Sequence, residues 1–70
     1  MISYKPLFML LLQKDMKKVQ LRDACSISPG TLAKLSKGEY VSLEVLDRIC
    51  LYLNCQLSDI AEVLPNKSEE

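Results

Sequence analysis

The sequence predicts an all-α protein, a compact bundle of five short helices. Apolar residues recur at spacings of three and four through most of the chain, which is the period of an α-helix. Two of these segments carry the residues expected at helix ends: serine stands before them, at Ser28 and Ser42, and Gly38 and Asn54 follow. We find no convincing strand in the pattern.

The first two helices are expected at residues 5–14 and 17–25. Pro6 falls in the first turn of the first helix, where its missing N–H leaves no hydrogen bond unmade. This helix is more apolar than a one-sided helix requires, because further apolar residues point away from its inward stripe. The stripe is Leu7, Leu10, Leu11 and Lys14, and the residues pointing elsewhere are Phe8, Met9 and Leu12. The second helix is expected to face inward with Val19 or Gln20, and with Leu21, Ala24 and Cys25.

The third helix has the clearest boundaries. Ser28 is expected to be its N-cap, accepting a hydrogen bond from an N–H of the first turn, and Pro29 takes the first helical position. Gly38 ends it in the left-handed conformation. The residues expected in the core of the protein are Leu21, Ala24, Ile27, Leu32, Leu35, Leu46, Ile49 and Leu53.

The fourth helix is expected to run from its N-cap Ser42 to a left-handed stop at Asn54. A fifth, short helix begins at Ser58 or in the turn before it and ends at Pro65. It carries Leu57, Ile60, Ala61 and Leu64.

Composition excludes most enzyme classes. A chain of 70 residues and 7.9 kDa holds one small domain, expected over residues 1–65 and followed by a polar, acidic tail at 66–70. It has no histidine, the usual acid–base residue and zinc ligand. Its three cysteines form no C-x-x-C pair, and its two glycines are too isolated for a phosphate-binding loop. We therefore expect no catalysis, no metal, no cofactor and no small-molecule ligand.

The same residues indicate a soluble, cytoplasmic protein without a membrane partner. The longest apolar run, Leu7–Leu12, is six residues long, whereas a bilayer span needs about 20. No signal-peptide pattern precedes it. An odd number of unpaired cysteines is typical of a reducing compartment.

Charge is unevenly distributed, although the net charge is zero. Residues 1–38 hold seven Lys and Arg against two Asp, giving +5, whereas residues 39–70 hold two Lys and Arg against seven Asp and Glu, giving −5. A protein polarised in this way can present a basic face to a polyanion such as nucleic acid. Charge alone leaves open the alternative that solvated charges segregate by chance.

Residues 17–38 combine two helices and a tight turn at Ser26-Ile27, the pattern of a helix-turn-helix. The matching series is Met16-Lys17, Leu21, Ile27-Ser28, Thr31-Leu32, Leu35, Gly38, Ser42-Leu43, Leu46, Ile49, Leu53 and Leu57-Ser58-Asp59-Ile60. Over residues 5–64 the chain resembles small regulators of the phage-repressor (Cro/Xre) type, which have the lambda-repressor-like fold. Two positions depart from the family pattern. Arg22 stands where the family often has Ala and must reach solvent, and Ser26 stands where it usually has Gly, so a left-handed serine would cost about 1 kcal/mol.

The resemblance implies that the third helix, from about Ser28 to Lys37, enters the major groove of double-stranded DNA. The family reads base edges from the positions of Pro29, Gly30, Ala33 and Lys34. Because only Lys34 carries a hydrogen-bonding group, direct readout should be thin, and DNA shape and half-site symmetry should matter more. The expected phosphate contacts are Lys17, Lys18, Ser28, Thr31, Lys37, Tyr40 and Ser42. Lys5 and Lys14 are expected to be ordinary solvated lysines.

The resemblance also implies a homodimer, since such regulators bind paired half-sites. Apolar residues in excess of one small core mark two candidate surfaces. One lies at the junction of the fourth and fifth helices and consists of Leu51, Tyr52, Cys55 and Leu57; the other is Phe8, Met9 and Leu12. We favour the first surface. The alternative is a core that wraps around these residues.

Two functions are compatible with the sequence. The first is a DNA-binding transcriptional regulator, expected to be a repressor. The second is an antitoxin-like or accessory subunit of the same fold that binds a protein partner through its acidic half, which the zero net charge and the poor base-reading residues favour. Charge reversal at Lys34 and Lys37 should separate them, because only DNA binding would be lost.

Overall fold

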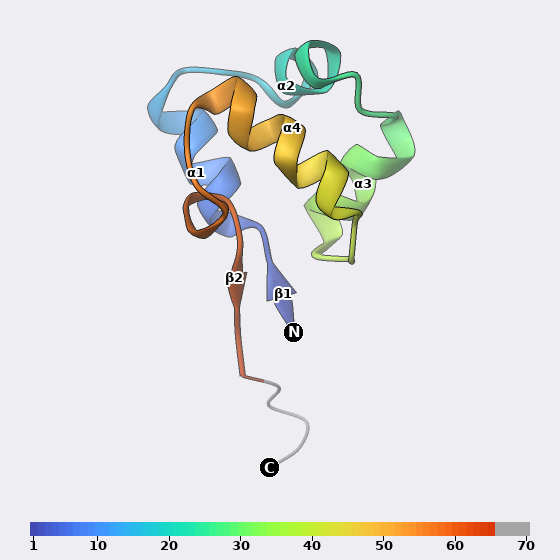
Figure 1. The fold of residues 1–70 in the computed structure, drawn as a ribbon, viewed down its shortest axis with the longest axis vertical. Helices are drawn as coiled ribbons and strands as arrows, with labels where there is room; N and C mark the ends of the chain where they lie inside the picture. Colours follow the sequence, from blue (N-terminus) through green and yellow to red (C-terminus); the bar gives the residue numbers. More distant parts are fainter. Residues whose placement is uncertain (66–70) are drawn as a thin grey trace.

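Four α-helices and a short two-stranded ribbon build residues 1–65, the part of the chain that the computed structural model describes (Figure 1). The helices are α1 (Lys5–Gln13), α2 (Lys18–Cys25), α3 (Pro29–Lys37) and α4 (Leu43–Leu53). The other elements are a 3-10 turn, η1 (Leu57–Asp59), and the strands β1 (Ile2–Ser3) and β2 (Glu62–Val63). The predicted helical bundle is confirmed, and the predicted acidic tail lies outside the described residues. No helix in residues 1–65 is long and apolar enough to span a membrane.

The predicted fifth helix is wrong, and so is the expectation of no strand. After the single turn η1, the chain extends as β2 and pairs antiparallel with β1, Ile2 opposite Val63 and Ser3 opposite Glu62. The ribbon continues at Met1 and Leu64, where the Leu64 N–H donates to the Met1 carbonyl at 2.7 Å. The physical reason is that β1 supplies backbone partners which no local periodicity reveals, since they lie about 60 residues away in the sequence.

The core is built by inward residues of every α-helix and by Ile60 after η1. Six of the eight predicted core residues are buried: Leu21, Ile27, Leu35, Leu46, Ile49 and Leu53. Leu32 is half-buried and packs against them. Ala24 is exposed, as are Val19 and Gln20, because the buried stripe of α2 consists of Leu21 and Cys25, four residues apart.

The helix ends follow the predicted chemistry. The Ser28 hydroxyl accepts from the Thr31 N–H at 3.1 Å, and the Ser42 hydroxyl accepts from the Val45 N–H at 3.3 Å. Gly38 is left-handed, with φ of 76°, as is Asn54 after α4, with φ of 55°. These ends set the lengths of α3 and α4.

Candidate nucleic-acid interface

The turn between α2 and α3 fixes the angle at which α3 leaves the body of the protein. Ser26 ends α2 with φ of 56° and ψ of 44°, which is the left-handed serine expected from the sequence. The next residue, Ile27, donates its N–H to the Arg22 carbonyl at 2.9 Å and is only 5% exposed. Arg22 reaches solvent in part, and its Nε donates to Asp23 Oδ1 at 3.1 Å. A buried isoleucine therefore anchors the turn in the core.

The outer face of α3 carries the four predicted base-reading positions. Pro29, Gly30, Ala33 and Lys34 are all exposed, whereas Leu35 on the opposite face is buried. Nothing in the fold requires a glycine at residue 30, because a Cβ added there would meet only the Ser28 hydroxyl, at 3.9 Å. This face is low in relief and bears a single ammonium group among those four positions.

Two of the predicted phosphate ligands are bonded to each other. The Ser28 O–H donates to Thr31 Oγ1 at 3.0 Å, while the Ser28 oxygen accepts the Thr31 N–H. The hydroxyl hydrogen of Ser28 is therefore already engaged by Thr31. The hydroxyl hydrogen of Thr31 remains to donate to an anion. Lys37, in the last turn of α3, is exposed.

The start of α2 presents the other two predicted lysines. Lys17 is the N-cap residue, and its backbone N–H donates to Gln20 Oε1 at 2.7 Å. Lys18 holds its ammonium 4.5 Å from the centroid of the Phe8 ring, a cation–π arrangement. The aromatic ring thus orients this cation beside the positive end of the α2 dipole, where an anion is stabilised.

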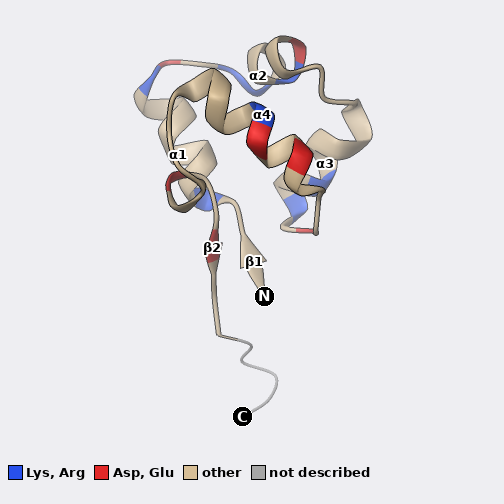
Figure 2. Cartoon of the chain, viewed as in Figure 1, with Lys and Arg blue, Asp and Glu red and all other residues tan. Residues whose placement is uncertain are grey.

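The remaining predicted contacts lie in the loop between α3 and α4. Tyr40 is 79% exposed, and Ser42 is exposed while it caps α4. In Figure 2 lysines colour α3 and the start of α2, whereas acidic residues lie on α4 and β2. The charge separation seen in the sequence is therefore in part a separation in space. Asp15, Asp23 and Glu39 are acidic exceptions, and the basic exceptions are Arg48 on α4 and Lys5, which lies near Asp59 and Glu62.

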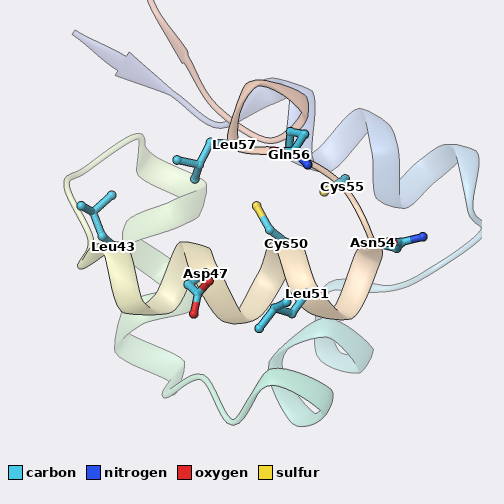
Figure 3. A pocket seen from close by; sticks show the side chains of 8 residues that line it. All are labelled: Leu43, Asp47, Cys50, Leu51, Asn54, Cys55, Gln56 and Leu57. Carbon is cyan, nitrogen blue, oxygen red and sulfur yellow. The ribbon is translucent and has the colours of Figure 1, made fainter.

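A groove runs along the outer face of α4. It has a volume of about 480 Å³ and lies between α4 and the segment that follows it (Figure 3). It is lined by Leu43, Asp47, Cys50, Leu51, Asn54, Cys55, Gln56 and Leu57. Leu51 is 74% exposed and Leu57 50%, so the core does not wrap around them. Tyr52, the remaining predicted interface residue, is exposed on α4 but does not line the groove.

The second apolar surface predicted from the sequence is exposed as well. Met9 and Leu12 on α1 are 61% and 80% exposed, whereas Phe8 is half-buried beneath Lys18. Within residues 1–65 no group of three His, Cys, Asp or Glu is arranged to hold a metal ion.

Comparison with known proteins assigns the fold to a family. Residues 7–66 match the family model of the Cro/C1-type HTH DNA-binding domain. The chain belongs to this family. The Cro/C1-type chain is also similar to a solved structure described as the crystal structure of transcriptional regulator VanUg, Form II. The two share 54% sequence identity with a TM-score of 0.91, over 93% of this chain and 87% of that one. No curated protein sequence matches closely enough to count as a relative.

One contact at the candidate interface of this Cro/C1-type chain was not expected from the sequence. The sequence indicates only that Phe8 points away from the inward stripe of its helix, yet Phe8 supports Lys18 at the start of α2. The two residues lie on different helices, ten positions apart. Their contact depends on how α1 and α2 pack, and no local pattern in the sequence could have indicated it.

Proposed function

We propose that this protein is a DNA-binding transcriptional repressor that acts as a dimer and inserts α3 into the major groove. Its Cro/C1-type domain and its similarity to a transcriptional regulator support a DNA-binding regulator and point away from an enzyme. The observation that carries the proposal is the outer face of α3, where the small exposed residues Pro29, Gly30 and Ala33 are followed by exposed Lys34 and Lys37.

Phosphate contacts supply most of the proposed affinity. Lys17, Lys18 and the N–H groups at the start of α2 offer one anchor, with the α2 dipole in favour. Lys37 on α3, with Tyr40 and Ser42 in the following loop, offers a second one. The Thr31 hydroxyl adds a donor between them, while Ser28 acts chiefly through its cap.

Base readout is proposed to be sparse, with Lys34 donating to guanine and the Ala33 methyl touching thymine. Pro29 and Gly30 have no polar side-chain atoms, so they contribute a close approach to the DNA rather than hydrogen bonds. Selectivity then depends on DNA shape and on two half-sites about one helical turn apart.

The dimer is proposed to form through the groove along α4, with Leu51, Cys55 and Leu57 contributing its apolar surface and Tyr52 lying beside it. Contiguous exposed apolar surface of this kind usually marks an interface. Two copies joined there would present two α3 helices, which the weak readout of a single α3 requires.

Fluorescence anisotropy tests the proposal, with the protein titrated onto a labelled duplex from its own upstream region and onto a random duplex of equal length. We expect preference for the upstream region and an affinity that falls steeply with salt. The double variant Lys34→Glu, Lys37→Glu should weaken binding by about tenfold or more. The matched control Lys5→Glu, Lys14→Glu makes the same charge change away from α3 and should bind nearly as the wild type does. Failure of the wild type to bind at low salt would overturn the proposal.

The second candidate function is an accessory subunit that binds a protein partner through its acidic face. Exposed Glu44 and Asp47 on α4, with Glu62 on β2, support it. Arg48 pairs with Glu44 at 3.0 Å, which offsets part of that charge. Under this function the Lys34→Glu, Lys37→Glu variant should still bind its partner, whereas Asp47→Lys should not.

A further inference from the structure

The last turn of α4 brings two cysteine side chains to the same side of the chain. Asn54 is left-handed, with φ and ψ of 55°, and the N–H groups of both Asn54 and Cys55 donate to the Cys50 carbonyl. The Cys55 bond is 3.0 Å long. This six-to-one bond is typical of a Schellman helix ending, which is frequently accompanied by a contact between the side chains at these two positions. Here both of those residues are cysteines.

Cys55 lies near enough to Cys50 to affect the ionisation of its thiol. Burial raises the pKa of the Cys50 thiol above its ordinary value, and Cys55, Asp47 and Asp59 raise it further. The Cys50 thiol is therefore neutral at neutral pH.

Both cysteines are reachable from solvent through the groove. Each is half-buried, and both line the groove along α4. Figure 3 shows the Cys50 sulfur directed between α4 and the segment that carries Gln56 and Leu57. Cys25 differs, because it is 5% exposed in the core and its Sγ lies 3.8 Å from the Arg48 carbonyl oxygen.

We propose that Cys50 and Cys55 form a reversible intrachain disulfide across the end of α4. A disulfide needs Cα atoms about 4.4–6.8 Å apart and side chains that already face each other, which this helix ending favours. The oxidant is a low-molecular-weight disulfide. The thiolate of one cysteine attacks it, which forms a mixed disulfide and releases one small thiol. The thiolate of the second cysteine then attacks that bond and releases the other small thiol.

The electrons balance in this exchange. The two protein thiols lose two protons and two electrons and form one S–S bond, while the S–S bond of the oxidant breaks and takes them up as two thiols. A reducing thiol reverses the steps. Because only the thiolate attacks, oxidation should be slow at neutral pH and faster as the pH rises.

The disulfide would also change the shape of the groove and so affect self-association. This second inference rests on the proposed dimer. The two sulfur atoms must approach to about 2.05 Å to form the bond, so they move from their positions in the reduced groove. A partner would then meet a groove of a different shape. Closely packed apolar surfaces are sensitive to such changes of shape. We therefore expect the oxidised protein to self-associate more weakly than the reduced protein.

The test uses the wild-type chain with oxidised glutathione as the probe, followed by mass spectrometry. The expected product is a chain lighter by two hydrogen atoms, without glutathione, in which Cys25 alone still reacts with a thiol reagent after unfolding. Cys50→Ser and Cys55→Ser should each stop at a glutathione adduct. Wild-type chains that keep glutathione on both residues, become linked to each other or stay reduced under the same conditions would overturn the proposal.

Sedimentation equilibrium of the reduced and oxidised chains tests the effect on the groove. Weaker association of the oxidised wild type, restored by a reductant and absent from the Cys50→Ser, Cys55→Ser double variant, is the expected result. Equal association of both forms would overturn the effect on the groove. Absence of association in either form would instead contradict the proposed dimer and leave the disulfide to the mass measurement.

Discussion

The ammonium of Lys18 lies 4.5 Å from the centre of the Phe8 ring, so a residue of α1 holds a cation at the start of α2. A surface cation–π contact of this kind contributes about 0.5–1 kcal/mol. In the proposed DNA complex this contact would act through orientation, because a lysine that is already directed loses less side-chain entropy when it meets a phosphate.

Two substitutions, one on each side of this contact, distinguish the charge of Lys18 from its orientation. Lys18→Met would remove the proposed phosphate contact, so it should lower DNA affinity and reduce the salt dependence by about one counterion. Phe8→Leu keeps the Lys18 charge but removes the ring that orients it. DNA affinity should therefore fall less, and the salt dependence should stay that of the wild type. Anisotropy titrations at several salt concentrations measure both. An unchanged salt dependence in Lys18→Met would remove Lys18 from the interface.

The left-handed serine after α2 makes the protein less stable than it could be. Ser26→Gly should raise the free energy of unfolding by about 1 kcal/mol, since glycine adopts this conformation without strain. Ala33→Gly is the control, because it makes a glycine inside α3 and should lower the free energy of unfolding by about 1 kcal/mol. Urea unfolding followed by circular dichroism measures both. A destabilised Ser26→Gly variant would contradict the strain.

The two glycines should respond in opposite ways to alanine. The added Cβ of Gly30→Ala would lie 3.9 Å from Ser28 Oγ, an ordinary contact, so we expect no loss of stability. We expect weaker DNA binding, because the added methyl keeps the DNA away from α3. Gly38→Ala should destabilise the fold by about 1 kcal/mol or more, because φ is positive there. Its added Cβ would also lie 3.3 Å from the Ile2 carbonyl oxygen. Wild-type DNA affinity in Gly30→Ala would argue against close contact at residue 30.

A lysine substitution tests whether the groove along α4 is the dimer interface. Leu51→Lys should weaken self-association by about tenfold or more while the monomer keeps its helical content, because Leu51 is 74% exposed. Leu12→Lys makes the same change on the other apolar surface, where Leu12 is 80% exposed, and should leave self-association intact. Analytical ultracentrifugation compares the two. The opposite pattern would move the interface to α1.

The sequence predicts those parts of the fold that depend on neighbours along the chain. The N-caps Ser28 and Ser42 and the left-handed Gly38 act within their own helices, and each lies where the sequence places it. The β1–β2 ribbon joins residues about 60 positions apart, and Tyr4, buried just before α1, has no periodic partner. Those features arise from the tertiary fold and have no local signature.

The candidate site likewise has features that the sequence predicts and features that it does not. The positions on α3 follow from the family resemblance, and the structure exposes all four predicted base-reading residues. The hydrogen bond that couples Ser28 to Thr31, and the ring beneath Lys18, depend on side-chain geometry. Neither could be obtained from residue type and spacing alone.

The β1–β2 ribbon has a practical consequence for any experiment on α3. The Met1 ammonium donates to the Leu64 carbonyl at 2.9 Å, and Met1 and Ile2 share a surface hollow with Lys34, Gly38 and Tyr40. A purification tag or fluorophore fused before Met1 would remove this charged bond and would start beside the helix that is proposed to meet DNA. Labels for the binding measurements therefore belong on the DNA.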